Sequence, residues 1–125
     1  NVDKNPPNNQ LLRDIFKMAD FVDRMLEKAL RAFETQDLNL AQNVIKADDN
    51  LYQEFRSALR RISTFLMEDA RCVGHVVDIV LVLRALERIG GHAKNIGGYV
   101  ILLVTGKDVR HESLEHIEAK ILAAT

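Results

Sequence analysis

The sequence predicts an all-α protein: an antiparallel up-down-up three-helix bundle with a short C-terminal helix. Three observations support this fold class. Apolar residues recur at spacings of three and four along most of the 125-residue chain, as in helices with one buried face. Glycine and proline are scarce, at six and two residues, and both are unfavourable in helix interiors. Short polar segments separate three long periodic stretches, which places consecutive helices antiparallel.

The N-terminal part of the chain is predicted to contain a flexible leader and then a long helix. The leader, residues 1–9, carries Pro6-Pro7 and four asparagines, of which Asn8 or Asn9 is a suitable helix cap. The helix that follows has a stripe of apolar residues at heptad spacing: Leu12, Ile15, Ala19, Val22, Leu26, Ala29 and Phe33.

The second predicted helix follows a tight connection at residues 35–37, where Asp37 is expected to cap it. Its stripe, one residue of which is charged, comprises Ala41, Val44, Asp48, Leu51, Phe55, Ala58, Ile62 and Phe65. Residues 68–73 are then expected to turn the chain into the third helix.

The third predicted helix is the longest, beginning at Val73 and ending at Gly106, a natural left-handed stop. Its apolar stripe comprises Ile79, Val82, Leu86, Ile89, Ala93, Ile96, Val100 and Leu103. We assign residues 10–110 to the bundle and residues 111–125 to a short C-terminal helix. That helix is expected to lie across the bundle or against a second copy.

Composition excludes several functional classes. The formal net charge of −1 argues against a protein that binds nucleic acid by neutralising phosphates. The apolar run from Val76 is interrupted by Asp78 and Arg84, so no membrane insertion is expected. The single cysteine, Cys72, has no internal disulfide partner, and no signal peptide is recognisable. These features predict a cytoplasmic protein.

Two carboxylates lie among apolar residues, where burying an ionised group costs free energy unless it is paired. Asp48 falls within the stripe of the second helix. It either reaches water at the edge of that stripe, beside Asp49, or faces a metal or an arginine. Glu87 follows three apolar turns of the third helix and is expected to pair with Arg84 or Arg88.

Two glycine pairs, Gly90-Gly91 and Gly97-Gly98, lie within the same helix. Each glycine costs roughly 1 kcal/mol relative to alanine in a helix interior. Either the pairs form a flat seam that lets another helix come close, or larger side chains have been lost there. The sequence leaves both explanations open.

The third helix and its end resemble the second repeat of the PhoU family of phosphate-signalling proteins. The residues that carry this resemblance are Leu86-Glu87-Arg88-Ile89-Gly90-Gly91-His92-Ala93-Lys94-Asn95-Ile96 and Val104-Thr105-Gly106-Lys107-Asp108-Val109-Arg110-His111. Residues 33–37 and 65–69 also resemble family segments, and the likeness covers residues 10–111. The resemblance implies a cytoplasmic negative regulator of the phosphate-starvation response, built in the family from two three-helix bundles.

The resemblance also implies partners and a metal site. Family members link the phosphate ABC transporter to its sensor histidine kinase, and several bind iron, zinc or other divalent metals through acidic E/D-x-x-x-D motifs. Asp48 and Glu87 match the first acidic position of two such motifs, but later acidic positions are replaced by Tyr52, Gly91 and Gly98. We therefore expect no firmly held cofactor, and at most weak divalent metal binding by Asp48 and Glu87.

The sequence thus predicts a non-enzymatic regulatory adaptor in phosphate uptake that acts by protein contact. The third-helix face that carries Arg84, Arg88, His92 and Asn95 is the expected contact surface, unless it is an ordinary solvated face. Two alternatives stay open: a divalent-metal-binding bundle, which lacks the expected Glu-x-x-His pairs, and a structural oligomerisation module.

Only one repeat is present, so the chain is either an excised C-terminal half or a half-length protein. A single bundle with an exposed apolar stripe gains from a symmetric partner, and we predict a homodimer.

Overall fold

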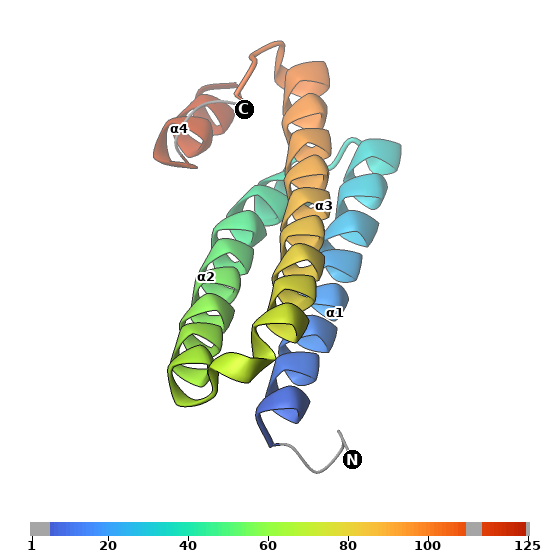
Figure 1. Cartoon of the computed structure of the whole chain (residues 1–125). Helices are drawn as coiled ribbons and strands as arrows, with labels where there is room; N and C mark the ends of the chain where they lie inside the picture. Colours follow the sequence, from blue (N-terminus) through green and yellow to red (C-terminus); the bar gives the residue numbers. More distant parts are fainter. Residues whose placement is uncertain (1–5, 110–113, 125) are drawn as a thin grey trace.

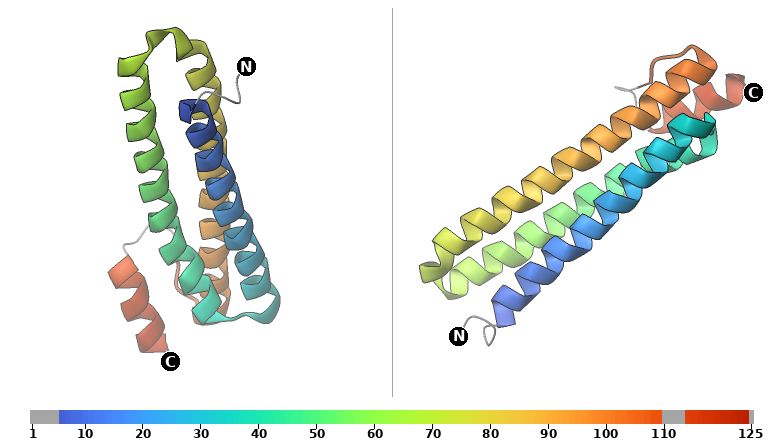
Figure 2. Two further views of the ribbon diagram at one scale, coloured as in Figure 1. Left: turned by 90° about the horizontal axis from the view of Figure 1, so that it is seen from below. Right: turned by 90° about the vertical axis from the view of Figure 1, so that its right-hand side faces the viewer.

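The computed structural model describes residues 6–109 and 114–124 (Figure 1). Its three long helices are α1 (Pro6–Thr35), α2 (Leu38–Glu68) and α3 (Val73–Thr105), and a short helix, α4 (Leu114–Ala124), follows. The three long helices lie side by side and the chain reverses direction between them (Figures 1 and 2). The predicted up-down-up three-helix bundle with a short C-terminal helix is therefore confirmed.

The helix ends follow from local chemistry. The Asp37 carboxylate accepts hydrogen bonds from the backbone N–H groups of Asn39 and Leu40, at 2.9 and 3.1 Å, and so caps α2 as predicted. A 3₁₀ turn, Ala70–Cys72, joins α2 to α3. Gly106 ends α3 with a φ of 75° and donates its N–H to the carbonyl of Leu102. Between these ends α3 is one continuous helix of 33 residues.

The predicted leader is wrong for residues 6–9, because α1 already begins at Pro6. Neither Asn8 nor Asn9 is therefore the cap. A proline is tolerated in the first turn of a helix, where its missing N–H has no intrahelical acceptor. Residues 1–5 of the predicted leader lie outside the described residues.

The main core fills the space between the three long helices. On α2 the predicted stripe is confirmed: all of its apolar residues are buried. On α1 the predicted stripe is displaced, because Leu12 and Phe33 are exposed. Among residues 10–35 of α1, the buried residues are instead Leu11, Asp14, Met18, Val22, Met25, Ala29 and Ala32.

On α3 the predicted stripe is also only partly buried. Val82, Ile89 and Leu103 are exposed. The buried residues of α3 are Val76, Ile79, Leu83, Gly90, Ala93, Gly97, Gly98, Val100 and Ile101. This helix is apolar around much of its circumference, so spacing alone selects no single face.

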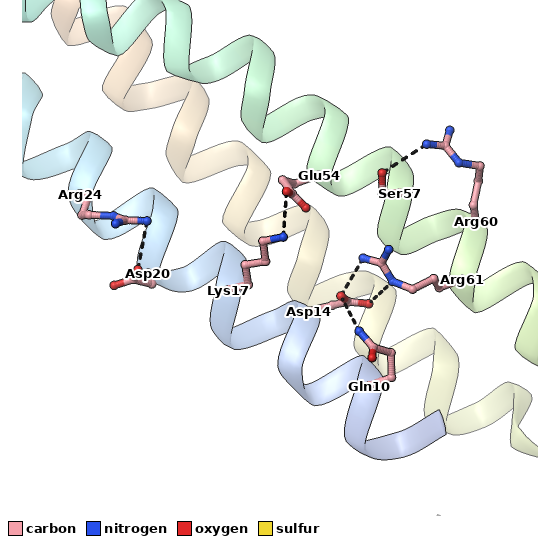
Figure 3. Close-up of polar contacts among 9 residues, drawn as sticks. All are labelled: Gln10, Asp14, Lys17, Asp20, Arg24, Glu54, Ser57, Arg60 and Arg61. Atoms are coloured by element: carbon pink, nitrogen blue, oxygen red, sulfur yellow. Dashed lines mark hydrogen bonds and ion pairs between the residues drawn. The ribbon is translucent and has the colours of Figure 1, made fainter. Parts of the chain in front are cut away.

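An ion pair between the buried Asp14 and the exposed Arg61 explains the register of α1. Asp14 is only 4% exposed, and it lies at a position that sequence patterning assigns to the polar side. Its carboxylate accepts hydrogen bonds from Nε and Nη2 of Arg61 on α2, at 3.0 and 2.7 Å, and from Gln10 at 3.3 Å. Figure 3 shows this cluster, with a second α1–α2 pair, Lys17–Glu54, one turn farther along. These hydrogen bonds and the charge of Arg61 offset the cost of desolvating the carboxylate at a core position.

α4 packs against the end of the bundle where α2 begins and α3 ends (Figure 1). Its Ile117 and Ile121 join a second apolar cluster with Ala41, Ile45 and Ile101. Of the two expected placements, the one on the chain's own bundle is confirmed. Within the described residues, no helix is both long and apolar enough to span a membrane.

Candidate functional site: the α2–α3 groove

A groove of about 540 Å³ lies between α2 and α3, and it unites the two sets of residues that the sequence suggested separately. It contains the metal candidates Asp48 and Glu87, and all four residues of the predicted contact surface. Its lining comprises Asp48, Asp49, Tyr52, Arg84, Glu87, Arg88, Gly91, His92, Lys94 and Asn95. We call this site the α2–α3 groove.

Helical spacing places these side chains together. On α2, Asp48 and Tyr52 are four residues apart and so point to the same side. On α3, the lining residues recur at steps of three and four from Arg84 to Asn95. Because α2 and α3 are antiparallel, this edge of α3 runs alongside the Asp48 edge of α2 over about three turns.

Charges alternate across the groove. The Lys94 ammonium lies 3.9 Å from Oδ2 of Asp48, and Nη1 of Arg84 lies 3.2 Å from Oε1 of Glu87. Burial raises the pKa of Asp48, and the negative charges of Asp49 and Glu87 raise it further. Lys94 lowers this pKa, but at 3.9 Å it does not offset the burial. Asp48 is thus a partly buried carboxylate beside a lysine, a partner that the sequence analysis did not name.

Replacing Asp48 with asparagine is expected to raise stability at neutral pH. The folded-state pKa lies above the ordinary value of 3.8, so ionisation of Asp48 opposes folding. Below about pH 3.8 the carboxyl is protonated in both states and the two proteins should be equally stable. The advantage of the variant should grow as pH rises through the folded-state pKa and stay constant above it. Urea unfolding across this range measures the difference, and a wild type more stable than Asp48→Asn at pH 7 would contradict it.

The two glycines of the Gly90-Gly91 pair have different surroundings. A methyl group at Gly90 would overlap Cδ2 of the buried Leu51 on α2, and one at Gly97 would lie 3.0 Å from the carbonyl oxygen of Ala41. Gly90 and Gly97 therefore form the close seam between the two helices. At Gly91 a methyl group would meet nothing within 4 Å, which leaves room for a larger side chain facing the groove. The seam explanation therefore holds for Gly90 and Gly97, and the loss of a larger side chain at Gly91 stays a prediction.

The donors present in the groove do not fit the metal site that the resemblance implies. Asp48 and Glu87 each lie beside a basic side chain, and Gly91 supplies no ligand. Of the other two altered acidic positions, Tyr52 lines the groove without a carboxylate, and Gly98 is buried and does not line it. In residues 6–109 and 114–124, no three His, Cys, Asp or Glu side chains are grouped as a metal site would require.

Sequence reasoning missed Lys94 as a site residue. Lys94 lies seven residues after Glu87, two helical turns farther along the same face, and this spacing was the available signal. Its ion pair with Asp48 depends on how α2 and α3 are aligned, which the sequence does not show directly.

Residues 15–100, more than half of the chain, match the family model of the PhoU domain. The chain belongs to the PhoU family. It is 41% identical over 108 residues to a phosphate-specific transport system accessory protein PhoU homolog of Pseudomonas putida, covering 86% of this chain and 42% of that protein. A Pseudomonas aeruginosa PhoU homolog is 43% identical over 100 residues, covering 80% and 41%, respectively.

The accessory protein PhoU of Escherichia coli is 32% identical over 100 residues, 80% of this chain and 41% of that protein. This PhoU-family chain thus spans about two-fifths of the length of the curated relatives it matches. No solved structure matches it.

Proposed function

We propose that this chain is a phosphate-transport accessory module that regulates phosphate uptake and phosphate-starvation signalling by protein contact, without catalysis. The names of its relatives, phosphate-specific transport system accessory proteins, support this role. The observation that carries it is the α2–α3 groove, where Arg88, His92 and Asn95 are exposed beside each other on a rigid helix pair. Its proposed partners are the phosphate ABC transporter and the sensor histidine kinase, in the cytoplasm, with no role for nucleic acid or membrane insertion.

The test is direct binding to the transporter ATPase subunit and to the kinase of the same organism. We expect Arg88→Glu to weaken binding at least about tenfold, because a reversed charge at an interface meets like charge on the partner. Arg31→Glu, at an exposed arginine on α1, is the matched control and should bind as the wild type does. Loss of binding by both variants, or by neither, would count against the groove as the contact surface.

We propose that any divalent metal, iron or zinc, binds only weakly, since Asp48 and Glu87 lie beside Lys94 and Arg84, whose positive charges repel a bound cation. Purified protein should carry metal far below one ion per chain. Near-stoichiometric iron or zinc by elemental analysis would overturn this proposal.

A second role, as an oligomerisation module, is supported by exposed apolar residues on the side of α1 and α3 that faces away from α2. On α3, Val82 and Ile89 lie on the edge opposite Glu87 and Lys94 by helical spacing. The set, which we call the α1–α3 face, comprises Leu12, Phe16, Leu30, Phe33, Val82 and Ile89. Several large exposed apolar residues on one side of a helix pair are typical of interaction sites. We propose that it pairs two copies of the chain.

Phe16→Glu is expected to convert this homodimer to a monomer, because it buries a charge in an apolar interface. Light scattering should give twice the chain mass of 14.2 kDa for the wild type and the single mass for the variant. Met67→Glu, at an exposed apolar residue outside this face, is the control and should remain dimeric. A wild type that is monomeric at micromolar concentration would contradict the pairing.

A further inference from the structure

The α2–α3 groove continues beyond the candidate site toward the connection between the two helices. A second cavity, about 650 Å³, shares Tyr52 and Arg84 with the candidate site. A third, about 410 Å³, shares Leu59 and Ser63 with the second. Together they form one extended groove along α2, to which α3 contributes Arg84 alone in the middle and residues 73–81 at the far end.

The chemistry of this extended groove changes along its length. The end near the connection is lined by apolar side chains and Ser63, and no charged residue lines it. Two of its apolar residues, Val77 and Leu81, are 50% and 62% exposed. Apolar side chains in this open groove are exposed to water, and an apolar surface of a partner would cover them favourably.

The middle section is basic. Arg56, Arg60 and Arg84 line it, and none of its lining residues is acidic. Arg84 is paired with Glu87 of the candidate site. The side-chain contacts of Arg56 and Arg60 are to neutral groups: the Tyr52 hydroxyl at 3.3 Å and the Ser57 hydroxyl at 3.2 Å. A partner segment with charges complementary to this section would therefore carry carboxylates.

We propose that the extended groove docks an amphipathic helix of a partner protein, with apolar residues at one end and carboxylates a turn or two farther along. Two antiparallel helices leave a trough that a third helix fills by the same packing that holds this bundle together. The apolar end of the docked helix would cover Val77 and Leu81, and its carboxylates would meet Arg56 and Arg60. This inference rests on the proposed function, since it specifies the protein segment that is bound.

A nucleic acid is a poorer match for the groove. Its phosphates could contact the arginines of the middle section, but they would make no favourable contact with the apolar end. A second copy of this chain is the competing protein occupant. The apolar set on the α1–α3 face is the alternative surface for self-association, and the experiment below separates the two.

The test uses the full chain and synthetic helical peptides, stapled on their outer face, of roughly 15 residues or about four turns. One carries leucines at helical spacing followed by glutamates, a second has this order reversed, and a third replaces the glutamates with lysines. We expect one of the first two to bind one-to-one by fluorescence anisotropy, and the lysine peptide to bind at least tenfold more weakly. The better order gives the direction of the docked helix.

Matched variants locate the binding. Arg56→Glu/Arg60→Glu and, separately, Leu81→Ser are each expected to weaken peptide binding at least tenfold. Arg24→Glu/Arg31→Glu, at two exposed arginines of α1, should leave it unchanged. Circular dichroism of each variant confirms that it is folded.

Three outcomes would overturn the inference: no binding of either acidic peptide, equal binding of the lysine peptide, or equal weakening by the α1 control. A dimer that Leu81→Ser dissociates would also overturn it, since a second copy would then fill the groove. None of these measurements uses the transporter or the kinase. If those proteins bind through another face, the proposed function survives and only the docked helix fails.

Discussion

Replacing Arg61 with alanine is expected to lower the unfolding free energy by about 2–4 kcal/mol. The substitution removes two hydrogen bonds from Asp14, a carboxylate that is only 4% exposed, and leaves Gln10 as its remaining side-chain donor. An ionised carboxylate that loses its cation in such a place must be desolvated without compensation. Chemical denaturation followed by circular dichroism measures the loss.

Two further substitutions distinguish the loss of the Asp14–Arg61 ion pair from the effect of removing any exposed arginine. Arg60→Ala removes an exposed arginine one residue away, whose side chain bonds only Ser57, and should change stability by less than about 0.5 kcal/mol. The double variant Asp14→Leu/Arg61→Leu should recover most of the loss, because apolar side chains of similar size replace a buried pair well. A loss of less than 0.5 kcal/mol for Arg61→Ala would mean that Asp14 is solvated and α1 is rotated.

The adjacent glycines of α3 are expected to respond to alanine with opposite signs. Gly90→Ala should cost about 1–2 kcal/mol, because its methyl group overlaps the fully buried Leu51 and the overpacking exceeds the gain in helix propensity. Gly91→Ala should instead stabilise the protein by about 0.5–1 kcal/mol, since nothing lies within 4 Å of its methyl group. Thermal or urea unfolding of the two variants gives the comparison.

Gly90→Ala and Gly91→Ala serve as controls for each other. Both replace a glycine with alanine at adjacent positions of the same helix. Equal stabilisation by both substitutions would show that Leu51 moves aside at no cost and that α2 and α3 are not held close at Gly90. Equal destabilisation would show that Gly91 is not open to the groove.

Much of the fold was predictable because its signals are local. Asp37 and Gly106 mark helix ends through hydrogen bonds to residues within one turn, and the stripe of α2 is complete in its own sequence. The register of α1 was not predictable in this way. Asp14 is buried because Arg61, 47 residues away, satisfies it, and no local pattern contains that information.

The candidate site was predicted as a set of residues but not as an arrangement. The sequence selected Asp48, Glu87 and the Arg84–Asn95 face from charge and spacing, yet the fact that they line one groove depends on how α2 and α3 are aligned. The difference between Gly90 and Gly91 likewise depends on the position of Leu51 across the seam. Such contacts depend on how side chains of neighbouring helices pack. The apolar periodicity of each helix fixes the alignment of two helices only to within about one residue.

The central claim is that the α2–α3 groove is the surface through which this PhoU-family chain meets its partner. Its most direct test is an NMR titration of isotope-labelled chain with the transporter ATPase subunit, followed through backbone amide shifts. We predict that the perturbed residues lie along residues 48–63 of α2 and 77–95 of α3, which cover the α2–α3 groove and its extension toward the connection. Perturbations confined to α1, around Phe16 and Leu30 of the α1–α3 face, would contradict the account.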